Sequence, residues 1–204
     1  MIRSIIFDMG QVLLRFDREL FLDRLGVSGE DRKMLMREVF LSVEWVMMDR
    51  GTLTEETAEP QMRARLPEHL HPAVHELTSR WDEPLIPVPG MYELVAELKE
   101  KGYGVYLLSN ASLRQHDYWP RLPVSRLFVG KLISADHGLM KPQREIYELF
   151  LETFGLKAEE CFFIDDSPAN IEGGNRCGIP GAVFHGDTAR LRGELQEAGV
   201  CVTV

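Results

Sequence analysis

Five side chains that could bind a metal ion or a phosphate group follow apolar runs of the sequence. Asp8 follows the run IIF, Ser109 and Asn110 follow YGVYLL, and Asp165 and Asp166 follow CFFI. In open α/β sheets, ligands bind outside the carboxyl ends of the strands. If these runs are neighbouring parallel strands, we expect the five side chains to converge in one cleft.

The charges of such a cleft predict a divalent cation. Three carboxylates repel one another, and without a cation at least one of them would take up a proton. Mg²⁺ prefers carboxylate oxygens as ligands, and Mn²⁺ is the alternative ion. Lys141, in the loop after the third expected strand, supplies a positive charge for a phosphate group, and Ser109 supplies a hydroxyl. A carboxylate in such a site can attack phosphorus and form an aspartyl-phosphate.

The elements that would position these groups alternate between strand and helix. Unbroken apolar runs predict strands over 2–7, 103–110, 131–134, 161–166 and 181–185. Helical spacing of apolar residues predicts helices over 90–102, 112–122, 142–155 and 167–178, with Pro142 starting the third of these. This alternation is typical of βαβ units, so we expect an α/β fold with a parallel sheet.

A helical segment interrupts this pattern after the first strand. Residues 17–82 show apolar residues at three- and four-residue spacings, and Thr54 marks the expected start of one helix. Three prolines in EPLIPVPG follow and indicate a boundary. We therefore expect a discontinuous core of residues 1–15 and 86–204, with residues 16–85 inserted as a small all-helical cap.

Composition limits the possible partners. The chain of 204 residues has a net charge of −9, which argues against binding to nucleic acid or to an anionic membrane surface. Its three cysteines show no CxxC spacing, so neither a disulfide framework nor a zinc site is expected. We see no secretory signal and no apolar run long enough to span a membrane. A cytoplasmic monomer is the default expectation.

Four segments of the sequence resemble the motifs of the haloacid dehalogenase-like hydrolase superfamily. They are IIFDMGQVL, YLLSN, the lysine of GLMKPQREIY, and FFIDDSPANI, and the resemblance extends over residues 2–184. It implies a Rossmann-like parallel sheet flanked by helices, with a helical cap after the first strand. It also implies a nucleophile at Asp8, a phosphate-binding hydroxyl at Ser109 beside Asn110, and a charge-stabilising Lys141. The implied metal ligands are Asp8, the Gly10 carbonyl and Asp166, with Asp165 as the acidic neighbour.

Gly10 departs from the usual pattern of the superfamily. Most of its phosphatases carry a second aspartate at this position, which protonates the leaving group and later activates water. A glycine still offers its carbonyl to the metal, but the acid/base carboxylate is absent. Because proton transfer contributes about 10²–10⁴-fold to rate, another group must act in its place. That group is a substrate group, a water molecule or a nearby side chain, and among side chains Gln11, Asp17 and His116 are the candidates, which the sequence does not rank.

A narrower resemblance indicates the class of substrate. FDMGQV, MKPQREIY and DDSPANIEGGN are similar to bacterial sugar 1-phosphate phosphatases and to the phosphatase-like domain of epoxide hydrolases. The resemblance implies a metal-dependent phosphatase for a small phosphorylated metabolite, such as the sugar phosphate glucose 1-phosphate. Two alternatives stay open. One is a 2-haloacid dehalogenase, in which Asp8 attacks carbon. The other is a catalytically weak protein that binds a phosphorylated ligand, to which only Gly10 points.

Overall fold

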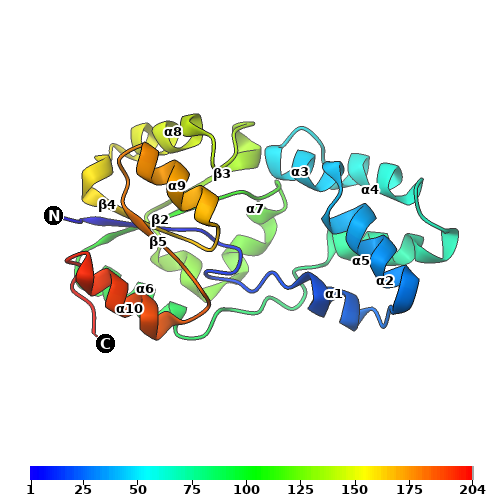
Figure 1. Ribbon diagram of the computed structural model, residues 1–204, viewed down its shortest axis with the longest axis horizontal. Coiled ribbons are helices and arrows are strands. Elements are labelled where there is room, and N and C mark those ends of the chain that lie inside the picture. The colour runs from blue at the N-terminus through cyan, green and yellow to red at the C-terminus, as the bar shows by residue number, and fades with distance from the viewer. Residues whose placement is uncertain (204) are drawn as a thin grey trace.

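A five-stranded parallel sheet forms the centre of the larger part of the molecule (Figure 1). We describe residues 1–203 from a computed structural model. The strand order is β3-β2-β1-β4-β5, so the first strand of the chain lies in the middle of the sheet. The strands are β1 (Ser4–Phe7), β2 (Gly104–Ser109), β3 (Gly130–Ile133), β4 (Cys161–Asp165) and β5 (Gly181–Val183). The predicted α/β class with a parallel sheet is confirmed.

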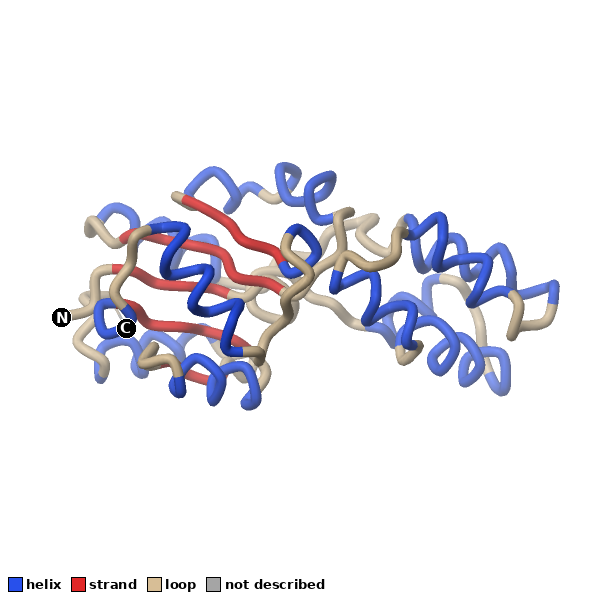
Figure 2. The backbone as a smooth tube through the Cα atoms, turned by 90° about the horizontal axis from the view of Figure 1, so that it is seen from above, coloured by secondary structure: helices blue, strands red, loops and turns tan. Residues whose placement is uncertain are grey.

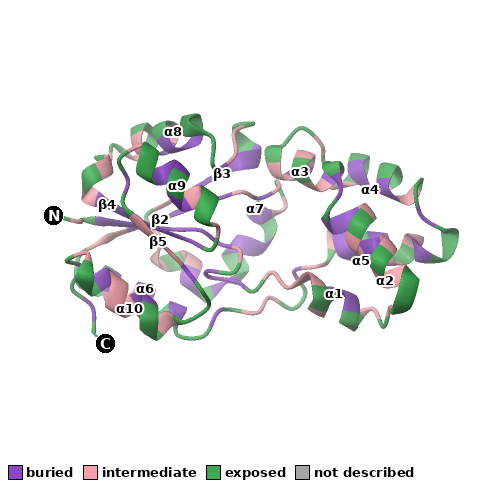
Figure 3. Ribbon diagram, viewed as in Figure 1, coloured by how far each residue is buried: buried purple, intermediate pink, exposed green. Residues whose placement is uncertain are grey.

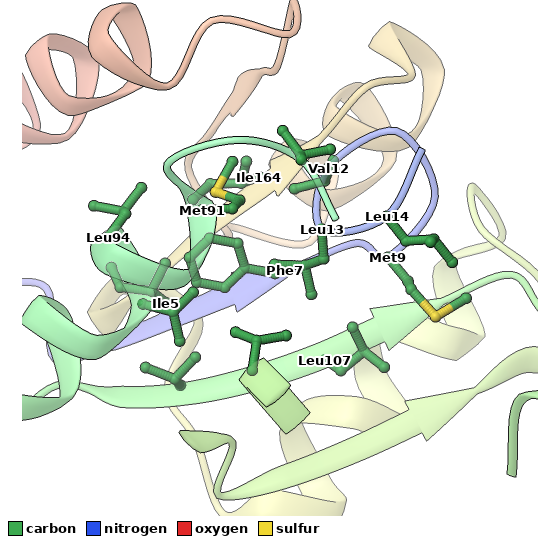
Figure 4. Packing of buried hydrophobic residues seen from close by; sticks show 14 of the residues in the cluster. Ile5, Phe7, Met9, Val12, Leu13, Leu14, Met91, Leu94, Leu107 and Ile164 are labelled. Carbon is green, nitrogen blue, oxygen red and sulfur yellow. The ribbon is translucent and has the colours of Figure 1, made fainter. Parts of the chain in front are cut away.

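The central strand shows why an unbroken apolar run marks this sheet. All four residues of β1 are buried, because helices cover both faces. Side chains alternate between the two faces, so Ile5 and Phe7 pack in one core cluster and Ile6 packs in another. Phe7 lies beside Met91 and Leu94 on the first face (Figure 4).

Two helices cover each face of the sheet. Helices α6 (Met91–Glu100) and α10 (Thr188–Glu197) pack on the face of Phe7, and α8 (Arg144–Phe154) and α9 (Pro168–Arg176) pack on the opposite face (Figure 1). Their buried residues lie on the sides that face the sheet, and their other sides are exposed (Figure 3). This arrangement leaves the carboxyl edge of the sheet open for a site.

The helices between β1 and α6 form a helical body beyond that edge (Figures 1 and 2). Its buried side chains form a hydrophobic cluster of their own, which includes Phe21, Val39 and Met62. A capping box between Thr54 and Thr57 begins one helix, as the sequence predicts. The helices are α1 (Arg18–Arg24), α2 (Gly29–Leu35), the π-helical turn η1 (Met36–Phe40), α3 (Val43–Arg50), α4 (Glu55–Arg63) and α5 (His71–Ser79). Within residues 1–203, no helix combines the length and apolarity needed to cross a membrane.

Two predicted helices differ from the structure. The helix expected over 112–122 is only the short α7 (Gln115–Tyr118), followed by a 3₁₀ turn that contains Pro120, which has no N–H to continue an α-helix. The predicted start of α8 at Pro142 is also wrong, since the helix begins at Arg144. The backbone of Lys141 is held instead by Asn110, whose amide side chain both donates to its carbonyl and accepts from its N–H.

Candidate active site at the carboxyl edge of the sheet

A buried lysine joins two carboxylates at the centre of the sheet edge. Asp8 follows β1, and Asp165 ends the neighbouring strand β4. The Nζ of Lys141 donates hydrogen bonds to Asp8 Oδ1 at 2.8 Å, to Asp165 Oδ2 at 2.6 Å and to the Leu108 carbonyl at 2.8 Å. The Lys141 side chain is 1% exposed, so all three of its N–H donors are used inside the protein. The ammonium group is therefore fixed beside Asp8.

Asp165 and Asp166 have different surroundings, although they are adjacent in sequence. Both oxygens of Asp165 accept hydrogen bonds from Asn170, Oδ1 also accepts from the Ser167 N–H at 2.8 Å, and the side chain is fully buried. Asp166 lies in the open cleft and is exposed. Asp165 therefore has little capacity left for a further ligand, whereas Asp166 is free to bind one.

The carboxylates of this edge fit a divalent cation. Asp8, Asp165 and Asp166 each place one oxygen so that the three atoms lie within 4.8 Å of one another. Lys141 provides one positive charge against three negative charges, which leaves an excess that a hard cation would neutralise. Lys141 occupies Oδ1 of Asp8, and Oδ2 points toward Gly10, where an added Cβ would lie 3.9 Å from it. The donor set therefore fits Mg²⁺, with Asp8 Oδ2 and Asp166 as the available carboxylate oxygens.

The pKa values reflect this crowding of negative charge. Burial raises the pKa of Asp8 to about 6, against the lowering effect of Lys141 and with a further rise from Asp165. Burial and the charge of Asp165 also raise the pKa of Asp166. The charges of Asp165 and Asp8 raise the pKa of Lys141 despite its burial, so it stays cationic. The site without a metal therefore disfavours full ionisation of its acids.

The two residues that end the second strand have different places in the site. Asn110 lines the cleft and holds the Lys141 backbone through two hydrogen bonds of 2.8 and 2.9 Å. Ser109 is 1% exposed and does not lie among the residues that line the cleft. The structure thus brings Asp8, Gly10, Asn110, Lys141 and Asp166 to one cavity. It places Asp165 and Ser109 directly behind them.

A cavity of about 840 Å³ extends from these residues to the helical body. Its lining contains five aromatic side chains, which we call the aromatic wall: Phe16, Phe40, Trp45, Trp81 and Tyr118. The rings contact one another in pairs. Their centroids lie 4.9 Å apart for Phe16 and Trp81 and 5.1 Å apart for Trp81 and Tyr118. The π-helical turn η1 contributes Phe40 to the wall, and such turns are frequent at functional sites.

The three side chains that the sequence suggested as acid/base groups have other partners. The Asp17 carboxylate caps α1 by accepting from the Leu20 N–H at 3.1 Å. His116 pairs with Asp136 at 2.9 Å and does not line the cavity. Gln11 lines the cavity, but its amide does not titrate and its carbonyl accepts from the Phe16 N–H.

Three other acids line the cavity that the sequence analysis did not single out, and the first of them is Glu19 on α1. Asp49 is near the end of α3, and Glu55 begins α4. They lie in the helical segment, more than forty residues from Asp8 in the sequence, and no motif marks them. In the sequence, Asp49 and Glu55 lie on either side of Gly51, and this pattern alone does not place them near Asp8.

Comparison with known proteins is consistent with this fold and site. The model of haloacid dehalogenase-like hydrolases matches residues 2–178. The sesquiterpene phosphatase astK of Aspergillus oryzae is 29% identical over 192 residues, which cover 88% of each chain. The (S)-2-haloacid dehalogenase 4A of Burkholderia cepacia is 26% identical over 189 residues, which cover 87% of this chain and 80% of that one.

A solved structure shows the same fold. The HAD family enzyme bt-2542 from Bacteroides thetaiotaomicron, in complex with magnesium and inorganic phosphate, superposes with a TM-score of 0.70. It is 23% identical and the superposition covers 94% of this chain and 99% of that one. The family match over most of the chain, together with the four motifs at one sheet edge, establishes the family. The chain is a hydrolase of the haloacid dehalogenase-like family.

Proposed function

We propose that this hydrolase is a metal-dependent phosphatase that cleaves small phosphate monoesters through an aspartyl-phosphate on Asp8. The observation that carries the proposal is the contact of Lys141 with both Asp8 and Asp165, beside the open carboxylate of Asp166. One cation and three acids leave this site with an excess of negative charge. A divalent ion would neutralise that excess and would then allow a phosphate group to bind.

Each residue of the site has a role in this proposal. Asp8 attacks phosphorus, and Lys141 holds the Asp8 carboxylate and stabilises negative charge next to it. Asp166, Asp8 and the Gly10 carbonyl would hold Mg²⁺ or Mn²⁺, which neutralises charge on the phosphate oxygens when bound. Asp165 positions Lys141 rather than binding the metal, because its oxygens already accept hydrogen bonds from Ser167, Asn170 and Lys141.

Ser109 and Asn110 complete the proposed phosphate site. The Asn110 side chain lies in the cavity and fixes the loop of Lys141. For Ser109, whose side chain is buried behind the cavity, we propose that its hydroxyl reaches the phosphate only when substrate is bound. The bt-2542 structure holds magnesium and inorganic phosphate together, and we propose the same pair of ligands here.

We propose that residues 16–85 act as a cap that selects the substrate. The cap supplies the aromatic wall, apart from Tyr118, and the cavity of about 840 Å³ leaves room for a small organic group. Aromatic faces stack on the apolar face of a sugar ring, which supports a sugar phosphate such as glucose 1-phosphate. The same wall also suits an isoprenoid chain, and the relative astK is a sesquiterpene phosphatase.

A haloacid dehalogenase is the second candidate, favoured by the similarity to (S)-2-haloacid dehalogenase 4A. The carboxylates argue against it. Asp8 and Asp166 line the cavity, and the buried Lys141 is already paired with Asp8 and Asp165, so a carboxylate substrate would be repelled beside Asp8 unless a metal were present. A protein that binds a phosphorylated ligand without cleaving it is the third candidate. We also propose that the protein is cytoplasmic, since all three cysteines are free thiols, as in a reducing compartment. We propose that it is a monomer.

A substrate panel with matched variants tests these candidates. Phosphate release is measured from glucose 1-phosphate, farnesyl phosphate and p-nitrophenyl phosphate with Mg²⁺, and halide release is measured from 2-chloropropionate. We expect phosphate release that Asp8→Asn abolishes and that EDTA abolishes reversibly. Halide release in EDTA would establish the dehalogenase instead. Binding of phosphate esters without any release would establish the third candidate.

A further inference from the structure

Asp49 lines the same cavity as Asp8 and Gly10. It is the penultimate residue of α3, so it comes from the helical body and not from the sheet. The cavity at Gly10 has space for a side chain, since only Asp8 Oδ2 lies within 4 Å of an added Cβ. The cavity therefore has room at Gly10 and a further acid, Asp49, in its lining.

The backbone at Asp49 is fastened to the core. The Ser134 hydroxyl donates a hydrogen bond to the Asp49 carbonyl and accepts one from the Ala111 N–H at 2.9 Å. Ser134 therefore connects Asp49 to the loop that follows β2. Two residues further on, Gly51 packs so closely that an added Cβ would lie 2.1 Å from the Ala135 carbonyl oxygen. Its φ of +79° also favours glycine. These contacts fix where the Asp49 side chain can reach.

We propose that Asp49 is the acid/base residue of this enzyme, supplied by the helical body in place of the side chain absent at Gly10. The inference rests on the proposed phosphatase function. In the first step, Asp8 forms a bond to phosphorus, the bond from phosphorus to the ester oxygen breaks, and Asp49 gives its proton to that oxygen. In the second step, the Asp49 carboxylate takes a proton from water while the water oxygen attacks phosphorus, which releases phosphate and restores both acids.

The surroundings of Asp49 keep it protonated at neutral pH, as a general acid requires. Burial, together with the charges of Glu55 on α4 and of Asp8, raises its pKa to about 8, against the lowering effects of Arg18 on α1 and of a hydrogen bond from the Ser112 backbone. Tyr118, which faces Asp49 from α7, is neutral because burial and the charge of Asp49 raise its pKa.

Glu55 provides a matched control, because it lines the same cavity and has a different partner. Its carboxylate accepts a hydrogen bond from the Ser112 hydroxyl at 2.6 Å. Replacing it with glutamine removes one negative charge near Asp49 without removing Asp49. We therefore expect Glu55→Gln to lower the pKa of Asp49 and so to move the pH at which the rate falls.

The test compares leaving groups that differ in their need for a proton. First-turnover rates of wild type, Asp49→Asn and Glu55→Gln are measured with Mg²⁺ on p-nitrophenyl phosphate and on an alkyl phosphate. p-Nitrophenolate leaves without being protonated, whereas an alkoxide needs a proton from an acid in order to leave. We expect Asp49→Asn to slow the alkyl ester by about 10²–10⁴-fold and the aryl ester by less than about tenfold. In wild type the alkyl rate should fall as pH rises above about 8, and Glu55→Gln should move this fall to lower pH.

The outcomes separate this inference from the proposed function. If wild type cleaves both esters and Asp49→Asn slows them equally or not at all, Asp49 is not the acid and the phosphatase function stands. If wild type cleaves neither ester, the proposed function itself fails. If Asp49→Asn does not fold, the pH profile of the alkyl rate in Glu55→Gln tests the inference instead. A shift to lower pH supports Asp49 as the acid, and an unchanged profile overturns the inference.

Discussion

The ammonium group of Lys141 lies 2.8 Å from Oδ1 of Asp8, although 133 residues separate the two in the sequence. The contact gives the two oxygens of the Asp8 carboxylate different surroundings. Oδ1 accepts a hydrogen bond from Lys141, and Oδ2 faces Gly10. The contact also leaves one buried cation among three acids. The stability, metal affinity and pH response of the protein should all depend on this local charge.

Lys141→Met should destabilise the fold as well as abolish turnover. The substitution leaves Asp8 and Asp165 buried without their cation, and breaking a buried ion pair costs about 3–5 kcal/mol. Urea unfolding at pH 7 measures the loss. Lys101→Met is the control, because Lys101 pairs with Glu97 near the protein surface and its loss should lower the stability far less. An equal effect of the two variants would contradict the buried network.

Asp166→Asn should remove the stabilisation that Mg²⁺ gives to the folded protein. A ligand that binds only the folded state stabilises it by about 2.7 kcal/mol at a hundred times its Kd. Asp166 is the exposed carboxylate of the acidic group, so its loss should weaken Mg²⁺ binding at least about tenfold by titration calorimetry. Asp117→Asn, which removes an exposed acid elsewhere, should bind Mg²⁺ as wild type does. Unchanged affinity in Asp166→Asn would place the metal elsewhere.

The metal-free protein should lose stability as pH rises from about 4 to about 6, in part because of Asp8. Its pKa is 3.8 when unfolded and about 6 when folded, so the folded state holds more protons within this range. Stability therefore falls as Asp8 ionises, by about 1–3 kcal/mol. Urea unfolding in EDTA across this range, compared between wild type and Asp8→Asn, isolates the effect. Two parallel stability curves would show that Asp8 has no raised pKa.

Gly10→Asp should supply a second acid to the site. The added side chain fits, because Asp8 Oδ2 at 3.9 Å is the only atom near the new Cβ. In the background of Asp49→Asn, we expect it to restore the alkyl ester rate at least about tenfold, since it offers a proton within the same cavity. Gly10→Asn fits the same space without an acid and should restore nothing. Equal rates in the two double variants would show that no proton donor is missing.

Trp45→Ala should weaken substrate binding more than it slows the chemical steps. Trp45 belongs to the aromatic wall and contacts Phe40 with ring centroids 5.1 Å apart. Its loss should raise KM for the preferred ester about tenfold, or about 1.4 kcal/mol, with kcat changed less than about threefold. Tyr92→Ala, at an exposed aromatic outside this cavity, is the control. A change in kcat alone would mean that the wall does not bind substrate.

Much of the fold followed from local patterns. The apolar run before Asp8 predicted a strand buried on both faces, and the same reasoning located β2 and β4 to within a residue or two. The helix expected over 112–122 was wrong because Pro120 and packing of Trp119 against Phe128 override the helical spacing. The domain boundaries at 15 and 86 and the roles of the site residues stay predictions.

The sequence by itself determined that acids stand at the ends of strands, because strand ends are local and parallel strands bring their carboxyl ends to one edge. Only the tertiary structure decided what each acid can do. Asp165 and Asp166 are neighbours in the chain, yet hydrogen bonds saturate one and leave the other open. Asp49 shares a cavity with Asp8 because the helical body lies beyond the sheet edge, where the Ser134 hydroxyl holds the Asp49 carbonyl. Such contacts depend on how distant segments pack, and no local period of the sequence encodes them.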